Sequence, residues 1–209
     1  MKKLKNAIKT LLILCISLLI AGIFCEGVIR LFYNKFKNYN LEMWRYAVEL
    51  KKPMPGPKLP FHHYENKSGN FYNVNITTNS FGFRDHEVSP EKNDSVCRII
   101  FLGDSFTLGW GVDVDSTFSK VLEKRLSGQR KKYEVINTGI GNYNSIMEVE
   151  LFKLKGLALK PDLVILMFFV NDVEPVPQVS RMESSFIRNS YLFAFILDKI
   201  QKIVVALNK

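Results

Sequence analysis

The sequence is poor in the residues that build disulfide frameworks and metal sites. It has three cysteines and three histidines in 209 residues, and Cys15 and Cys25 both lie in one long apolar segment. The remaining cysteine, Cys97, begins a predicted strand. Neither a disulfide framework nor the spacing of a metal site can be built from these positions. We therefore expect no metal and no cofactor.

Acidic residues are also scarce, with 20 Asp and Glu against 29 Lys and Arg, so the net charge is +9. Residues 1–37 hold seven basic residues and one acidic residue, which accounts for +6 and leaves only +3 for the rest of the chain. No basic stripe interleaved with aromatic residues appears elsewhere, so we expect no nucleic-acid partner. We interpret the basic residues as membrane flanks plus a mildly basic surface.

The main apolar run lies near the amino terminus. Leu11–Cys25 contains no charged residue, and the run approaches the length of about 17–20 residues that crosses a bilayer if Lys9 snorkels to the headgroups. A cleaved signal peptide should end in a small-x-small site, which Phe24 and Cys25 do not supply. We favour an uncleaved signal anchor over a cleaved peptide or a buried soluble helix. A slight excess of basic residues before the run predicts a single-pass membrane protein with an extracytoplasmic globular part.

The remaining sequence predicts three parts. Residues 1–50 form a transmembrane anchor and a juxtamembrane helix, residues 51–94 a linker and an irregular lead-in, and residues 95–209 a partial α/β domain. The linker is predicted from residues 51–61, which contain four prolines and one glycine and are stiff rather than helical or extended.

Strand and helix patterns alternate from Cys97 onwards. Short apolar runs at 97–102, 133–137 and 163–169 predict strands, and the segments 118–126 and 145–159 between them predict helices. This alternation predicts a parallel sheet with helices on both faces, in which a flavodoxin-like order places the first strand at the centre. The predicted fold is a three-layer αβα arrangement, incomplete, with an amino-terminal transmembrane helix. We expect strand 163–169 to be buried on both faces, and Ser145 with Glu148 to form a capping box.

Three motifs follow the three strands. They read GDSFTLGWGV at 103–112, NTGIGNYNS at 137–145 and FVNDVEP at 169–175. Together, in this order and spacing, they resemble the first three conserved blocks of the SGNH/GDSL hydrolase superfamily. The segment NSFGFRD at 79–85 is similar to the approach seen in membrane-anchored members. The resemblance implies an esterase or acyltransferase acting on acyl esters of an envelope glycan or lipid.

The resemblance also implies roles for individual residues. Ser105 is the expected nucleophile, and Asn171 and a backbone amide of the Gly141-Asn142 turn are the expected oxyanion donors. The glycine of the second block is either Gly139 or Gly141. Asp104 and Asp172 are expected to position loops rather than react. The residues expected around the substrate are Asp104, Gly139, Asn142 and Asp172.

The general base is the missing part of this pattern. The family supplies it as an Asp-x-x-His pair near the carboxyl terminus, whereas no histidine follows His86 in this sequence. His62, His63 and His86 are interpreted as surface or loop residues. Because a serine hydroxyl reacts poorly without a base, and because two further strand-helix units are absent, we expect a truncated and catalytically impaired hydrolase.

Two other functions remain open. One is a non-catalytic, membrane-tethered binding or scaffold module with an SGNH-like fold, which the missing histidine favours. The other is a small-molecule binder of flavodoxin type. The sequence contains no phosphate-binding glycine-rich loop, which disfavours this function. The apolar segment 184–209 predicts an amphipathic helix that packs on the edge of the sheet or, alternatively, contacts a membrane surface.

Overall fold

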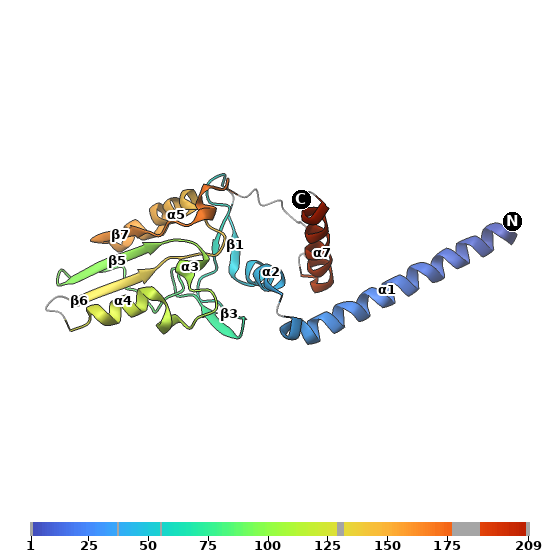
Figure 1. The fold of residues 1–209 in the computed structure, drawn as a ribbon, viewed down its shortest axis with the longest axis horizontal. Coiled ribbons are helices and arrows are strands. Elements are labelled where there is room, and N and C mark those ends of the chain that lie inside the picture. The colour runs from blue at the N-terminus through green and yellow to red at the C-terminus, as the bar shows by residue number, and fades with distance from the viewer. Residues whose placement is uncertain (1, 37, 55, 129–131, 177–188, 208–209) are drawn as a thin grey trace. The chain divides into compact units, whose positions relative to one another are not determined.

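The computed structural model describes residues 2–36, 38–54, 56–128, 132–176 and 189–207 (Figure 1). The chain forms two compact units. Unit 1 consists of Met1–Val48 and Met182–Lys209, and unit 2 consists of Glu49–Arg181.

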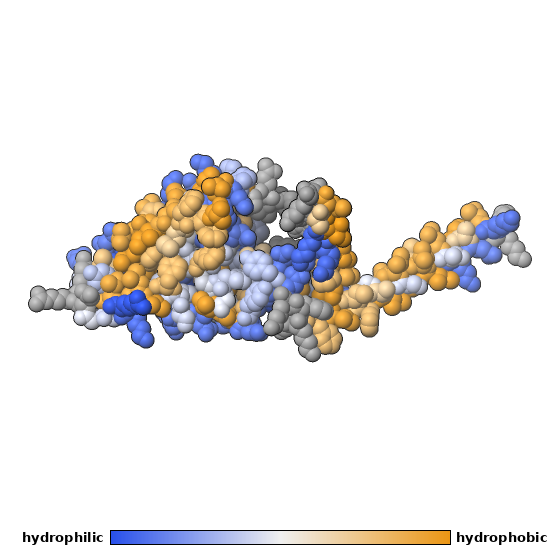
Figure 2. All heavy atoms as spheres, viewed as in Figure 1, coloured by the Kyte–Doolittle hydropathy of each residue, from blue (hydrophilic) through white to orange (hydrophobic). Residues whose placement is uncertain are grey.

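Unit 1 is helical. It contains α1 (Lys2–Phe36), most of α2 (Tyr39–Leu50) and α7 (Tyr191–Leu207). Helix α1 is long and apolar enough to cross a membrane, and only 6% of its apolar window is buried. Figure 2 shows apolar side chains along the length of α1. The predicted amino-terminal helix is thus confirmed.

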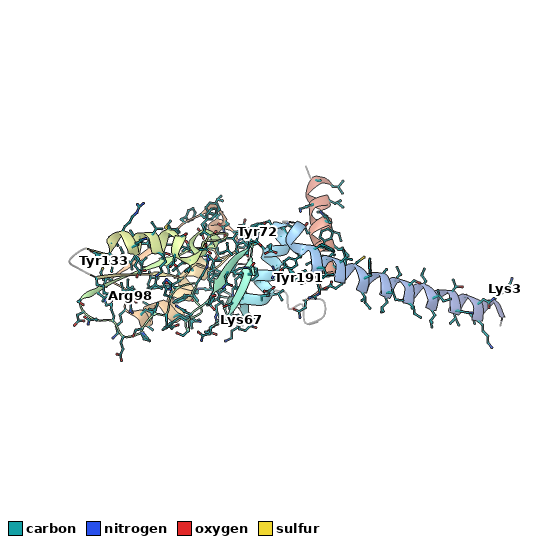
Figure 3. All side chains as sticks on the ribbon, turned by 90° about the horizontal axis from the view of Figure 1, so that it is seen from below. Lys3, Lys67, Tyr72, Arg98, Tyr133 and Tyr191 are labelled. Atoms are coloured by element: carbon teal, nitrogen blue, oxygen red, sulfur yellow. The ribbon has the colours of Figure 1, made fainter. Side chains whose placement is uncertain are left out.

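Helix α7 packs on α1 within unit 1. Their shared core contains Ile29 of α1, Leu41 of α2 and Ala194 of α7. Tyr191, which begins α7, lies with its ring centroid 5.5 Å from that of Tyr33 (Figure 3). Within unit 1, the apolar side chains of Tyr191, Leu192, Ala194 and Phe195 pack on the first two helices, whereas the predicted packing on the edge of the sheet stays a prediction.

Unit 2 is built on a parallel three-stranded sheet. Strands β5 (Val96–Leu102), β6 (Lys132–Asn137) and β7 (Leu163–Leu166) are arranged in the order β6-β5-β7. Ile99 of β5 lies opposite Val135 of β6 and Leu163 of β7. The predicted order, with the first strand in the centre, is confirmed.

Helices cover the two faces of this sheet. Successive strand residues point to opposite faces, so Ile99 and Phe101 pack against Leu122 and Leu126 of α4 (Phe118–Leu126). The opposite face packs against α5 (Ser145–Leu151), which continues through a π-helical turn η2 (Phe152–Gly156) and a 3₁₀ turn η3 (Leu157–Leu159). The predicted αβα layering is confirmed.

Two antiparallel hairpins precede the sheet. Strand β1 (Lys51–Pro53) pairs with β2 (Phe61–His63), and β3 (Ser68–Phe71) pairs with β4 (Val74–Thr77). The proline-rich segment 51–61, predicted as a stiff linker, thus includes β1 and the first residue of β2. Its Leu59 and Phe61 are buried in the core of unit 2, which anchors the hairpin.

Two local predictions differ from the structure. Helix α5 is capped by the Asn144 side chain, which accepts a hydrogen bond from the Met147 amide at 3.0 Å, so Ser145 is already helical. Strand β7 is not buried on both faces, since Leu163 is 48% exposed and Leu166 39% exposed. Within the described ranges, no strand pairs with its outer edge.

Candidate active site

Ser105 lies where β5 turns into the short helix α3 (Ser105–Leu108). Asp104 caps this helix, because its side chain accepts a hydrogen bond from the Phe106 amide at 2.9 Å. The helix ends at Gly109, whose φ of +79° is the left-handed conformation that glycine adopts most easily. This tight turn leaves the half-buried Ser105 at the carboxyl end of the central strand.

The loop after β6 packs directly on α3. A Cβ atom at Gly139 would lie 2.2 Å from the Leu108 nitrogen and 2.6 Å from the Thr107 carbonyl carbon, so only glycine fits. The Asn137 side chain donates to the Thr107 carbonyl at 2.6 Å, and the Ile140 amide donates to the Gly103 carbonyl at 3.1 Å. The first two motifs therefore form one packed structure.

The two candidate glycines of the second motif have different surroundings. The Gly139 amide donates to the Asn137 side-chain oxygen at 2.9 Å, so its role is close packing. The Gly141-Asn142 turn lies further along the loop, and Asn142 has a φ of +66°. The Gly139 amide is thus used within the loop by its bond to Asn137.

A buried lysine holds this turn. The Lys51 ammonium group donates to the Gly141 carbonyl at 2.6 Å and to the Asn142 side-chain oxygen at 2.9 Å. Its nitrogen also lies 4.2 Å from the centre of the Phe61 ring, and burial lowers the pKa of Lys51 to about 7. Sequence reasoning missed this residue, since it stands at the start of a segment that reads as a linker.

The third motif contacts the other two. Asn171 and Asp172 lie in the short helix η4 (Val170–Val173) after β7. The Asn171 side-chain amide donates to the Tyr143 carbonyl at 3.1 Å, and the Phe106 and Phe169 rings lie 4.4 Å apart. The loops after all three strands therefore converge around α3, as parallel strands allow at one edge of a sheet.

The segment before the sheet supports these loops with buried charges. The fully buried Arg84 guanidinium donates to the Leu108 carbonyl at 2.9 Å, to the Gly109 carbonyl at 2.6 Å and to the Val112 carbonyl at 2.6 Å. Its neighbour Asp85 accepts the Asn137 amide at 2.8 Å and pairs with Lys120 at 2.6 Å. Arg84 and Asp85 of segment 79–85 thus stabilise the loops of the first two motifs through buried hydrogen bonds.

The profile of the GDSL-like lipase/acylhydrolase family matches residues 101–207 of this chain, which is half of its length and contains all three motifs. The chain belongs to this family. The resemblance drawn from the motifs is therefore confirmed, together with the coarse activity of an SGNH-type hydrolase. No curated protein sequence matches the chain.

Three carboxyl groups lie together next to Ser105 in this GDSL-like domain. Asp104, Glu148 and Asp172 are each less than 10% exposed. Burial, and then the negative charges of Asp172 and Asp104, raise the pKa of Glu148 to about 8. Burial also raises the pKa of Asp104, although hydrogen bonds from the Phe106 amide and the Asn171 side chain act in the opposite direction. Glu148 is thus mainly neutral at pH 7, which limits the negative charge next to Ser105.

These contacts give Glu148 a place that sequence reasoning did not assign. It was expected to cap its own helix, whereas its position on the inner face of α5 brings it to the acidic pair. Among the described residues, no group of three His, Cys, Asp or Glu side chains is arranged to hold a metal ion.

The three histidines make contacts away from the serine of the GDSL-like motif. His63 is fully buried, its Nδ1 lies 3.1 Å from the Gly82 carbonyl, and burial lowers its pKa to about 3. His62 is also buried, with Nδ1 2.7 Å from the His63 carbonyl. Only His86 is exposed, where it pairs with Asp115 at 3.1 Å. The interpretation as surface or loop residues is wrong for His62 and His63, which lie in β2. The lowered pKa makes His63 a weaker base than an ordinary histidine.

Proposed function

We propose that unit 2 is an acyl-transferring domain in which Ser105 attacks the carbonyl carbon of an ester. In this reaction the serine oxygen forms a bond to the acyl carbon, and the alcohol leaves with a proton. Water or a second hydroxyl group then takes the acyl group from the serine. The convergence of the three strand-end loops on α3 is the observation that carries this proposal.

The negative oxygen formed during the attack needs hydrogen-bond donors. We propose that these donors are the Ser105 amide, a backbone amide of the Gly141-Asn142 turn and the Asn171 side chain. Asn171 is held by the Tyr143 carbonyl and by Asp104, so it is oriented before a substrate arrives. Its bond to Asp104 would be exchanged for a bond to the oxyanion. In this scheme Asp104, Gly139, Asn142 and Asp172 shape the substrate site without reacting.

The surroundings of Ser105 favour an apolar acyl group or a lipid. Phe106 is 63% exposed and Val170 is 71% exposed, and these apolar side chains flank the serine on two of the three loops. With α1 as a membrane anchor, such a site would act on O-acyl groups of an envelope glycan or on a lipid. We propose a single-pass protein whose unit 2 is extracytoplasmic, for which the basic residues before the apolar run of α1 are the support.

A fluorophosphonate probe tests the nucleophile, because it reacts covalently with an activated serine. We expect labelling of the full chain that Ser105→Ala abolishes and Ser127→Ala leaves unchanged, since Ser127 is an exposed residue at the end of α4. Labelling that survives in Ser105→Ala would refute the assignment. Mass spectrometry of the labelled peptide identifies the modified residue in either case.

A second function has one observation in its favour. The described contacts of the histidines join His63 to Gly82, His62 to His63 and Lys155, and His86 to Asp115, and none of these contacts is made with Ser105. We propose that these 209 residues are catalytically impaired, by about 10⁶-fold relative to a complete triad. If the probe does not react at all, the domain is a membrane-tethered module that binds an acylated glycan or lipid. Binding that is equal in the wild type and in Ser105→Ala would then support this function.

A further inference from the structure

Helix α7 has an exposed apolar face that its packing on α1 does not use. The six exposed side chains recur at intervals of three and four residues, which places them on one face of a helix. They are Ile196, Leu197, Ile200, Ile203, Val204 and Leu207, and they are between 44% and 79% exposed.

The opposite face of α7 fixes how the helix is rotated. Ala194 is buried against α1 and α2, and Asp198 is only 4% exposed. The Asp198 carboxylate accepts hydrogen bonds from the side chains of Asn38 at 2.9 Å and Asn40 at 2.6 Å. Because these contacts orient the helix, the apolar face is directed away from the core of unit 1.

One carboxylate fixes the position of α7 along α1. Glu26 is the first charged residue after the uncharged run that ends at Cys25. Its carboxylate accepts hydrogen bonds from the Ser190 hydroxyl at 2.9 Å, the Tyr191 amide at 3.0 Å and the Leu192 amide at 2.8 Å. The amino end of α7 is therefore tied to the point where the apolar part of α1 ends.

We propose that α7 lies in the boundary between headgroups and acyl chains of the membrane that α1 crosses, with its apolar face toward the acyl chains. The inference rests on the proposed membrane attachment through α1. Since Glu26 marks the end of the apolar run, a helix bound to it begins at the level of the bilayer surface. The apolar faces of α1 and α7 then form one continuous lipid-facing surface.

Two further features of unit 1 fit this position. Tyr33, Trp44 and Tyr191 form an aromatic cluster next to Glu26, and tyrosine and tryptophan are enriched at membrane interfaces. Lys199 and Lys202 are exposed on α7, and although Lys202 pairs with Asp198 at 2.9 Å, both ammonium groups are accessible to anionic phospholipid headgroups. The ligand is thus an anionic bilayer surface rather than a second copy of the chain.

Nitroxide quenching in vesicles tests this inference with the full chain. The three cysteines are replaced by serine, and a single cysteine labelled with the fluorophore NBD is introduced at Ile200, Lys202 or Ile13. Ile200 and Lys202 are a matched pair, since Ile200 is 51% exposed and the Lys202 side chain 56% exposed on different faces of the same helix. The vesicles contain phosphatidylcholine and phosphatidylglycerol with nitroxides at shallow or deep acyl positions.

We expect the shallow nitroxide to quench the label of Ile200→Cys at least twice as strongly as that of Lys202→Cys, and the deep nitroxide to quench that of Ile13→Cys. Quenching at position 13 with equal, weak quenching at 200 and 202 would overturn the position of α7 while membrane attachment stands. Absence of quenching at position 13 would overturn the attachment itself, and with it this inference. A blue-shifted label at 200 that responds to protein concentration but not to nitroxide would show a second copy on this face, which also overturns the inference.

Discussion

Units 1 and 2 position their parts by different means. In unit 2, buried charges join segments that are distant in sequence, as when Arg84 holds the carbonyls of residues 108, 109 and 112. In unit 1, the helices meet through apolar and aromatic packing, and the Glu26 carboxylate supplies the main polar tie between α1 and α7. The comparison indicates a rigidly braced site in unit 2 and a helix pair whose exposed side chains suit a lipid environment in unit 1.

Replacing Arg84 tests the bracing of unit 2 most severely. Arg84→Met leaves at least three buried carbonyl groups without their donor, so we expect unit 2 to lose about 3–5 kcal/mol of stability. Urea unfolding followed by Trp110 fluorescence in a Trp44→Phe background measures this loss, because each unit contains one of the two tryptophans. The matched control is Arg125→Met on the exposed side of α4, for which we expect a change below about 0.5 kcal/mol. Equal effects of the two substitutions would contradict the bracing role.

Glu148 makes the stability of unit 2 depend on pH. Its folded-state pKa of about 8 lies above the ordinary value of 4.5, so its contribution to stability is present below pH 4.5 and is lost as pH rises through 8. Between pH 5 and pH 9 we expect the wild type to lose a few kcal/mol of unfolding free energy, since one pKa unit corresponds to about 1.4 kcal/mol. Glu148→Gln should not show this loss.

The same fluorescence assay at pH 5 and pH 9 measures this effect. Lys51, whose pKa is lowered to about 7, gives a slope of opposite sign. It is present in both proteins, so the difference between them isolates Glu148. Parallel stability profiles for the wild type and Glu148→Gln would show that the carboxyl group is not coupled to the acidic pair.

Lys51 offers a finer test of how the Gly141-Asn142 turn, the proposed oxyanion loop, is held. Lys51→Met removes the ammonium group that lies over Phe61 and donates to Gly141 and Asn142, so we expect fluorophosphonate labelling of Ser105 to slow about tenfold, equivalent to about 1.4 kcal/mol. Partial recovery in Lys51→Arg would identify the hydrogen bonds as the cause. Lys52→Met is the control, because Lys52 is exposed and its contact with Glu65 is 3.5 Å long. If all three variants label at the wild-type rate, Lys51 does not position the loop.

The smallest expected effect concerns unit 1. Glu26→Gln keeps one oxygen acceptor but removes the negative charge to which the Tyr191 and Leu192 amides donate. We therefore expect the interaction between α1 and the amino end of α7 to weaken by about 1 kcal/mol. Amide hydrogen exchange over residues 191–195 should accelerate about fivefold. Glu91→Gln, an exposed substitution in unit 2, should leave this exchange unchanged. Unaltered exchange in Glu26→Gln would mean that apolar packing alone holds α7.

The sequence predicted the sheet well because its signals are local. Runs such as 97–102 and 133–137 are apolar, the helices between them show the expected periodicity, and the connections allow only a few orders. The motifs likewise placed Ser105, Gly139 and Asn171 at strand ends. These predictions needed no knowledge of distant contacts.

The parts that sequence reasoning missed depend on contacts between distant segments. Lys51 reaches a loop 90 residues away, and nothing in a proline-rich segment indicates that a hairpin will bury its first residue. The packing of α7 on α1 and α2 was also not predicted, because periodicity identifies an apolar face but does not tell which element covers it. Only coordinates show that Glu26 receives the amino end of this helix.

The close packing of Gly139 on α3 determines which positions an engineer can vary. Any side chain at 139 would displace the Thr107-Leu108 backbone and move the serine with it, so this position is closed to substitution. Phe106 and Asn142 stand on the same two loops but are exposed. Libraries aimed at changing acyl-group preference should therefore randomise these two positions and keep the glycine fixed.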